Sequence, residues 1–172
     1  MLRNQKSRSI LSERILTRRR LISVVRKMRA EQKTIVTTNG SFDLLHAGHI
    51  LLLEHAKRYG DILIVGVNSD SSIRQYKSPL RPIIPERFRA KLLAAIQFVD
   101  YVHIFTETDP IRFLRDVKPD IHVNSAQYGK NCIEAPVVKN LGGKLVLIPV
   151  KTDLLSTSTI VDSIIKKYGQ KT

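Results

Sequence analysis

Two histidines three residues apart are the side chains best suited to chemistry on a phosphate. His46 and His49 follow a glycine-containing segment, residues 38–45, and precede an apolar stretch typical of a helix. This spacing places both imidazoles on one face of that helix. Backbone N–H groups and the dipole at a helix start favour an anion, and histidines there can donate hydrogen bonds to a phosphate whose charge grows in a transition state. The segment predicts a site for phosphate transfer.

The glycine between the histidines supports the same interpretation. Gly48 lets a phosphate approach the backbone closely. Neither GxxxxGKS/T nor GxGxxG, two common phosphate-binding patterns, occurs in this segment. Two other interpretations stay open: a pair of metal ligands without an evident third ligand, and histidines that only pack the start of a helix.

The elements that position these residues alternate in type along the chain. Strands are expected at residues 34–38, 61–67, 101–105, 120–123 and 144–150, and helices at residues 48–59, 85–98, 110–117, 133–141 and 157–167. The second of these strands is a near-continuous apolar run, typical of burial on both faces. The order predicts an α/β fold: a Rossmann-like, doubly wound parallel sheet of about five strands in three α/β/α layers. Ligands bind such sheets at the carboxyl ends of the strands, where the two histidines follow the first strand.

Composition excludes several classes of protein. The chain has 172 residues, of which 42% are hydrophobic and 26% charged, as in ordinary globular domains. The single cysteine, Cys132, excludes an intramolecular disulfide and a CxxC metal site. No run approaches the roughly 20 apolar residues of a membrane span, and no signal-peptide pattern is evident. We therefore expect a cytoplasmic protein.

The charge is strongly positive and unevenly distributed. The net charge is +14, and residues 1–33 hold 11 basic and 2 acidic residues. We expect residues 1–16 to form a flexible basic arm and residues 17–172 a single domain that begins with a helix at residues 17–33, with Thr17 as its N-cap. Such an arm leaves nucleic-acid binding open, but phosphorylated substrates would suit the charge equally, and the domain has no run of aromatic residues for base stacking.

The segment GSFDLLHAGH at residues 40–49 resembles the GxFDxxHxGH signature of the HxGH nucleotidyltransferase superfamily, in its cytidylyltransferase-like branch. The resemblance covers residues 15–167 and is closest to the D-glycero-β-D-manno-heptose 1-phosphate adenylyltransferases. The further matching motifs are LIVGVNSD at residues 63–70, Lys77 followed by RPI at residues 81–83, Arg89, VDYV at residues 99–102, Pro119-Asp120, GGKLVLIP at residues 142–149 and STS at residues 156–158.

The resemblance implies an enzyme of the adenylyltransferase class. In it a sugar 1-phosphate attacks the α phosphate of ATP, with Mg²⁺ on the triphosphate and no metal ligand assigned among the protein side chains, in the synthesis of ADP-heptose for lipopolysaccharide core. The implied catalytic residues are His46, His49 and Lys77, the last on a mobile segment at residues 71–82. The implied nucleotide-binding residues are Asn39, Gly40, Ser41, Phe42, Asp43, Gly48, Asn68, Asp70, Arg81, Arg89, Ser156, Thr157 and Ser158. The implied partners are ATP and a sugar 1-phosphate, with neither nucleic acid nor membrane, in a homodimer.

Departures from the family pattern concern the acceptor. Where the heptose enzymes carry VKGGDY, this chain has VNSAQY at residues 123–128. Arg87 replaces a glutamate, and the turn at residues 156–158 reads STS where the family has STT. Two alternatives remain open. One is a glycerol-3-phosphate-type cytidylyltransferase that uses CTP, although the arginine of its RTxGISTT motif is missing. The other is a degenerate member that binds nucleotide without catalysis.

Overall fold

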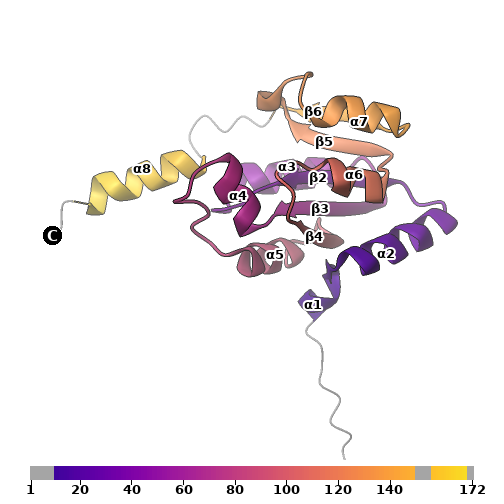
Figure 1. The fold of residues 1–172 in the computed structure, drawn as a ribbon, viewed down its shortest axis with the longest axis horizontal. Helices are drawn as coiled ribbons and strands as arrows, with labels where there is room; N and C mark the ends of the chain where they lie inside the picture. The colour runs from indigo at the N-terminus through magenta and orange to yellow at the C-terminus, as the bar shows by residue number, and fades with distance from the viewer. Residues whose placement is uncertain (1–9, 150–155, 170–172) are drawn as a thin grey trace, which may run out of the picture.

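Six parallel strands form one sheet in the part of the chain that the computed structural model describes, residues 10–149 and 156–169 (Figure 1). The strands are β1 (Ile15–Leu16), β2 (Ile35–Gly40), β3 (Ile62–Asn68), β4 (Tyr101–Phe105), β5 (Ile121–Ser125) and β6 (Lys144–Ile148). Their order is β1-β4-β3-β2-β5-β6. The chain runs from β2 toward one edge of the sheet and later returns to place β5 on the other side of β2. This reversal creates a crevice between the carboxyl ends of β2 and β5, where ligands bind doubly wound sheets.

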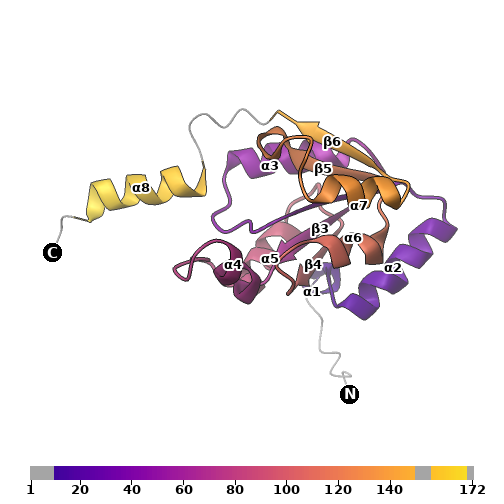
Figure 2. The same cartoon turned by 45° about the horizontal axis from the view of Figure 1, so that its top comes forward.

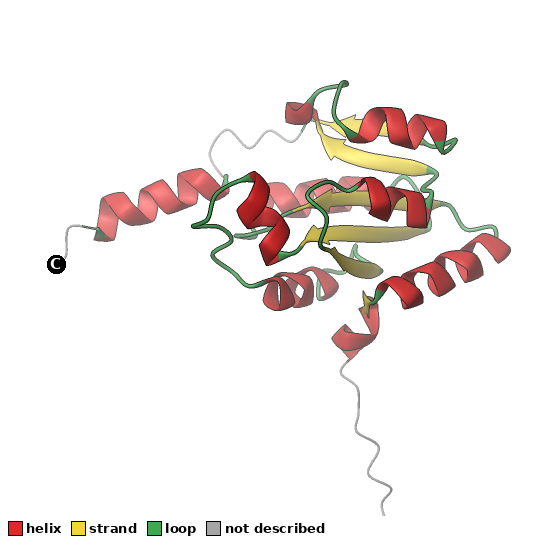
Figure 3. Ribbon diagram, viewed as in Figure 1, coloured by secondary structure: helices red, strands yellow, loops and turns green. Residues whose placement is uncertain are grey.

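Helices cover both faces of the sheet and give the three predicted layers (Figure 3). They are α1 (Ile10–Arg14), α2 (Arg18–Ala30), α3 (Ala47–Lys57), α4 (Asp70–Tyr76), α5 (Glu86–Ala94), α6 (Ile111–Val117), α7 (Glu134–Asn140) and α8 (Thr157–Tyr168), with a short 3₁₀ turn, η1 (Ala126–Tyr128). One apolar core joins α3 and α5 to the sheet, and a second joins α2, α6 and α7 to it. The fold predicted from the sequence, a Rossmann-like α/β sheet, is confirmed.

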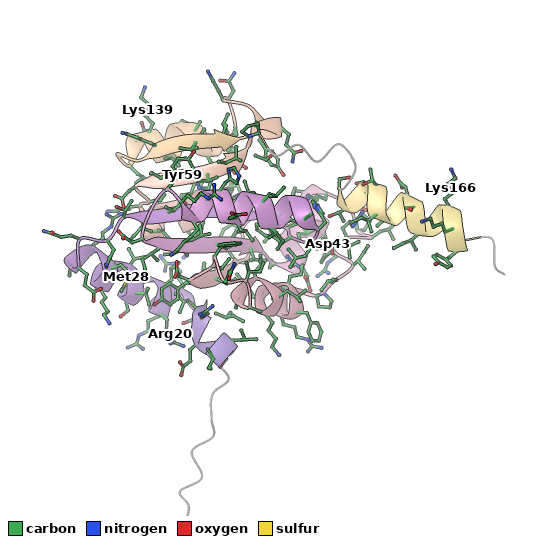
Figure 4. The ribbon with its side chains drawn as sticks, turned by 180° about the vertical axis from the view of Figure 1, so that it is seen from behind. Arg20, Met28, Asp43, Tyr59, Lys139 and Lys166 are labelled. Atoms are coloured by element: carbon green, nitrogen blue, oxygen red, sulfur yellow. The ribbon has the colours of Figure 1, made fainter. Side chains whose placement is uncertain are left out.

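The basic helix near the N-terminus packs through the apolar stripe that its sequence shows. Thr17 caps α2 by accepting a hydrogen bond from the backbone N–H of Arg20, as predicted. Leu21, Val25 and Met28 are buried against the sheet, whereas Arg20 is exposed (Figure 4). The helix ends at Ala30, three residues before the predicted end.

Residues 10–16, which were expected to belong to a flexible arm, form α1 and β1 instead. β1 pairs in parallel with β4, with Leu16 opposite His103, and Leu16 is buried. A strand of two residues carries no readable alternation, so only its tertiary pairing reveals it. It raises the number of strands from the expected five to six. Residues 1–9 lie outside the described residues, as does Val150 at the predicted end of the last strand.

A second unexpected element lies in the segment predicted to be mobile. Residues 70–76 form α4, whose N-cap Ser69 accepts a hydrogen bond from the backbone N–H of Ser72 at 3.1 Å. Lys77 follows directly as the C-cap residue. Among all the described helices, none is both long and apolar enough to span a membrane.

Candidate active site

The turn between β2 and α3 brings the two histidines to the carboxyl edge of the sheet. Phe42 has a left-handed backbone with φ of 46°, and its side chain is only 3% exposed. Its ring lies against Gly40, where an added Cβ would come within 3.3 Å of the ring. A glycine is therefore favoured at position 40, because the turn folds the Phe42 ring back over it. The chain then enters α3 with His46 at the N-cap position.

His46 and His49 lie against each other, as their spacing predicted. Their ring centroids are 3.9 Å apart, with an angle of 32° between the planes. The Nδ1 atoms of both rings are buried without a hydrogen-bond partner among the described residues. Burial lowers the pKa of His46, and burial together with the charges of His46 and Lys77 lowers the pKa of His49 to about 4. Both rings are therefore neutral near pH 7, with hydrogen-bonding capacity left unused, which is typical of a ligand site rather than of packing alone.

The histidines open onto a cavity of about 290 Å³ between the ends of β2 and β5. Many of the residues implied by the sequence line it: Asn39, Gly40, Ser41, Phe42, His46, Gly48, His49, Lys77, Ser156, Thr157 and Ser158. The first turns of two helices, α3 and α8, thus face the same space. Both helix starts favour an anion in that space.

Lys77 supplies an amine to the cavity from the end of α4. Its Nζ donates a hydrogen bond to Ser41 Oγ at 2.9 Å. Burial lowers its pKa, and the nearby Asp43 carboxylate opposes that effect. Among the described residues this is the one hydrogen bond that Lys77 Nζ forms, and the atom also lies 5.5 Å from the centre of the Tyr76 ring. An incoming phosphate could replace the Ser41 hydroxyl as its acceptor.

The start of α8 has both a structural role and a place in the cavity wall. Ser156 Oγ accepts a hydrogen bond from the backbone N–H of Thr159 at 3.1 Å, and Thr159 Oγ1 accepts one from the N–H of Ser156 at 2.7 Å. This capping box leaves the N–H groups of Thr157 and Ser158 free of backbone partners within the helix. Capping of α8 by this segment is therefore compatible with a role of its first turn in holding an anion.

A second cavity of about 250 Å³ adjoins the first and shares Ser41, Lys77, Thr157 and Ser158 with it. Asp43 and Arg81 line this second space. The Asp43 carboxylate accepts hydrogen bonds from Arg81 Nη1 at 2.8 Å and from the backbone N–H groups of Ile83 at 2.8 Å and Ile84 at 3.0 Å. Figure 4 shows Asp43 at the end of α3 that faces α8. Asp43 therefore fixes the segment that follows Lys77 against the histidine turn.

Asn68, Asp70 and Arg89, which the resemblance implied as nucleotide-binding, line neither of these two cavities. Arg89 is completely buried and donates hydrogen bonds to Asp70 Oδ1 at 2.7 Å, to the carbonyl of Ile84 at 2.8 Å and to the carbonyl of Ser41. Asn68 Nδ2 donates to Ser72 Oγ at 3.0 Å. In this structure these side chains brace the elements around the cavity.

The remaining wall of the cavity consists of uncharged side chains that the sequence did not single out individually. They are Leu52, Asn124, Ser125, Gln127 and Tyr128. Most come from the segment in which this chain departs from the heptose enzymes. Behind the wall, the buried Glu134 accepts a hydrogen bond from Asn39 Nδ2 at 3.2 Å. A lone glutamate at a helix start resembles an ordinary first-turn acid, so no sequence signal marked it.

No metal site of protein side chains is evident at the cavity. Within residues 10–149 and 156–169, no three His, Cys, Asp or Glu side chains gather so that they could hold a metal ion. The metal-pair interpretation of the two histidines therefore gains no third ligand from the described residues.

Comparisons with known proteins agree on one family. The sequence model of the family described as Cytidylyltransferase-like matches residues 37–162. The bifunctional protein HldE of Geobacter metallireducens is 41% identical over 88% of this chain, and that of Syntrophotalea carbinolica is 41% identical over 91%. The matched part is 31% and 32% of those proteins, so this chain spans about a third of their length.

Solved structures agree with the fold. The lipopolysaccharide core biosynthesis protein of Thermoplasma volcanium has a TM-score of 0.59 and 33% identity, over 69% of this chain and 98% of that one. A pantoate-β-alanine ligase of Francisella tularensis has a TM-score of 0.61 over 87% of this chain and 76% of that one. Its identity is 16%, so it supports the fold alone.

Proposed function

Since this chain belongs to the cytidylyltransferase-like family of nucleotidyltransferases, we propose that it transfers AMP from ATP to a sugar 1-phosphate and releases pyrophosphate. The acceptor proposed is D-glycero-β-D-manno-heptose 1-phosphate, which gives ADP-heptose. The observation that carries the proposal is the cavity in which two neutral histidines, Lys77 and two helix starts converge. The motifs shared with the heptose adenylyltransferases and the relatedness to bifunctional HldE proteins support the choice of substrates.

In the proposed reaction a phosphate oxygen of the acceptor attacks the α phosphorus of ATP, and the bond from that phosphorus to the pyrophosphate oxygen breaks. Such a transfer requires positioning and neutralisation of charge rather than a covalent nucleophile. His46 and His49 would donate hydrogen bonds to the phosphate oxygens as their charge grows. Lys77 would balance the triphosphate, and the first turn of α8 would hold a further phosphate oxygen.

Mg²⁺ is proposed to accompany the triphosphate and to neutralise part of its charge. Mg²⁺ usually keeps several of its waters and binds through substrate phosphates, so this proposal requires no cage of protein ligands. The binding of the ion would then depend on the phosphates.

The test is pyrophosphate release from ATP, Mg²⁺ and heptose 1-phosphate. Removing either imidazole, in His46→Ala or His49→Ala, should lower kcat by about 100-fold or more, because each would stabilise the transition state. A matched control is His55→Ala, which removes an imidazole from the last turn of the same helix. This variant should keep kcat close to that of the unmodified protein.

Two outcomes would overturn the proposal. Faster turnover with CTP than with ATP would favour a cytidylyltransferase. Tight ATP binding without turnover on heptose 1-phosphate would show that the acceptor is another compound or that catalysis has been lost.

A further inference from the structure

Glu134 is a buried carboxylate next to the proposed catalytic cavity. It is the first residue of α7, its side chain is 6% exposed, and it forms no ion pair with any described residue. Its Oε1 accepts the hydrogen bond from Asn39 Nδ2. Burying a carboxylate costs free energy unless hydrogen bonds compensate for lost water. The hydrogen bond from Asn39 therefore supplies a substantial part of the compensation for the water that the Glu134 carboxylate loses on burial.

This bond determines which way the Asn39 amide faces. An ionised carboxylate only accepts hydrogen bonds, so the NH₂ group of Asn39 points at Glu134 and Oδ1 points away from it. Asn39 lines the cavity, and its Oδ1 is buried without a partner among the described residues. An ionised phosphate oxygen also only accepts, so it cannot satisfy this Oδ1, whereas a hydroxyl group can.

The distribution of charge around the cavity also distinguishes a part suited to phosphate from a part suited to hydroxyl groups. Lys77 and the histidine pair lie on the side formed by the β2–α3 turn and the end of α4. The lining residues that come from β5 and the turn after it, Asn124 among them, are uncharged. Glu134 lies near this wall: it bonds Asn39 at the cavity, and after burial its charge is the next cause that raises the pKa of the Cys132 thiol. A carboxylate behind this wall repels a phosphate, so this part of the cavity suits hydroxyl groups better.

We infer that Glu134 is a positioning residue for the acceptor. It holds the Asn39 amide so that Oδ1 accepts a hydrogen bond from a hydroxyl group of the sugar phosphate, while the phosphates occupy the histidine side. Asn39 then serves the acceptor rather than the triphosphate. The identity of the acceptor rests on the proposed function, whereas the orientation of the amide rests only on the Glu134 contact.

The kinetic test compares Glu134→Ala with Glu134→Gln, using heptose 1-phosphate and ATP. Glu134→Ala releases the Asn39 amide and should raise the KM for heptose 1-phosphate about tenfold, the effect of one lost hydrogen bond, with the KM for ATP changed less than about twofold. Glu134→Gln keeps an oxygen that can accept from Asn39 Nδ2, so it should restore most of the affinity. Lys139→Ala, at an exposed position on the same helix, should change neither constant. A rise in the KM for ATP, or no rescue by glutamine, would overturn the inference.

A second measurement separates this inference from the proposed function. In ¹H–¹⁵N NMR spectra the hydrogen-bonded proton of the Asn39 side-chain NH₂ should be shifted downfield and protected from exchange with solvent in the unmodified protein and in Glu134→Gln. In Glu134→Ala both the downfield shift and the protection should be lost. If heptose 1-phosphate is not turned over, the proposed function fails, and the spectra together with ATP affinity by calorimetry still decide the role of Glu134. Spectra that are the same in all three proteins would refute that role.

Discussion

At the scale of single residues, imidazoles are held neutral both in the cavity and beneath it. His122 on β5 is completely buried, and its Nδ1 lies 2.8 Å from Thr37 Oγ1. Burial lowers its pKa to about 4, although the charge of Glu134 acts in the opposite direction. His49 has a pKa of about 4 for the same primary reason. Since an unfolded histidine titrates near pH 6.5, these residues make folding sensitive to acid.

The sign of this dependence follows from proton uptake. Between pH 6.5 and 4 the unfolded chain binds a proton at His122 that the folded protein excludes, so the free energy of unfolding falls as the pH falls. At pH 5 the loss from His122 should be about 2 kcal/mol relative to pH 7. Urea unfolding of the unmodified protein and of His122→Asn at both pH values measures it. The variant should be less stable at pH 7 but lose about 2 kcal/mol less on acidification; equal losses would contradict the assignment.

At the scale of elements, Arg89 on α5 connects three pieces of the chain around the cavity. Its guanidinium joins the carbonyl of Ser41 after β2, the carboxylate of Asp70 on α4 and the carbonyl of Ile84 before α5. In its ion pair with Asp70 the arginine side chain is completely buried, whereas the Asp70 side chain is 23% exposed. Breaking a buried pair from one side leaves the other group without its partner.

Arg89→Ala should therefore act first on stability. We expect a loss of about 3–5 kcal/mol in the free energy of unfolding, measured in urea. In the fraction that remains folded, kcat should fall because the Ser41 turn is displaced. Should stability stay unchanged while only the KM for ATP rises, Arg89 would contact the nucleotide directly, as the resemblance implied.

The same scale shows what a sequence can and cannot predict. The strand at residues 101–105 was predicted at its true bounds, and the other long elements within a few residues, because apolar periodicity and caps are local signals. Strand β1 was missed because its two residues show no periodicity, and helix α4 because Ile73 is its only buried apolar residue. In the site, the histidine turn was readable as a motif. The hydrogen bond of Arg89 to the Ser41 carbonyl joins residues 48 positions apart, and that of Asn39 to Glu134 joins residues 95 positions apart. No local sequence pattern encodes such contacts.

At the scale of the whole molecule, the chain combines a net charge of +14 with a cavity proposed to take two anions. A field of that sign draws anionic substrates toward the protein, and salt screens it over about 8–10 Å at physiological ionic strength. We expect kcat/KM for ATP to fall several-fold between about 50 and 500 mM NaCl, with kcat changing much less. Steady-state kinetics at fixed free Mg²⁺ measures this dependence. A flat kcat/KM across that range would show that the field does not steer the nucleotide.

Helix α8 lies to one side of the sheet in both views of the fold (Figures 1 and 2). It contains no buried residue, yet its first turn supplies Thr157 and Ser158 to the cavity. Segments with few buried contacts open at a lower free energy than the core does. The start of α8 should therefore leave the cavity at a lower free energy than the sheet needs to unfold. The phosphate contact proposed for its first turn would then be lost while the rest of the protein is still folded.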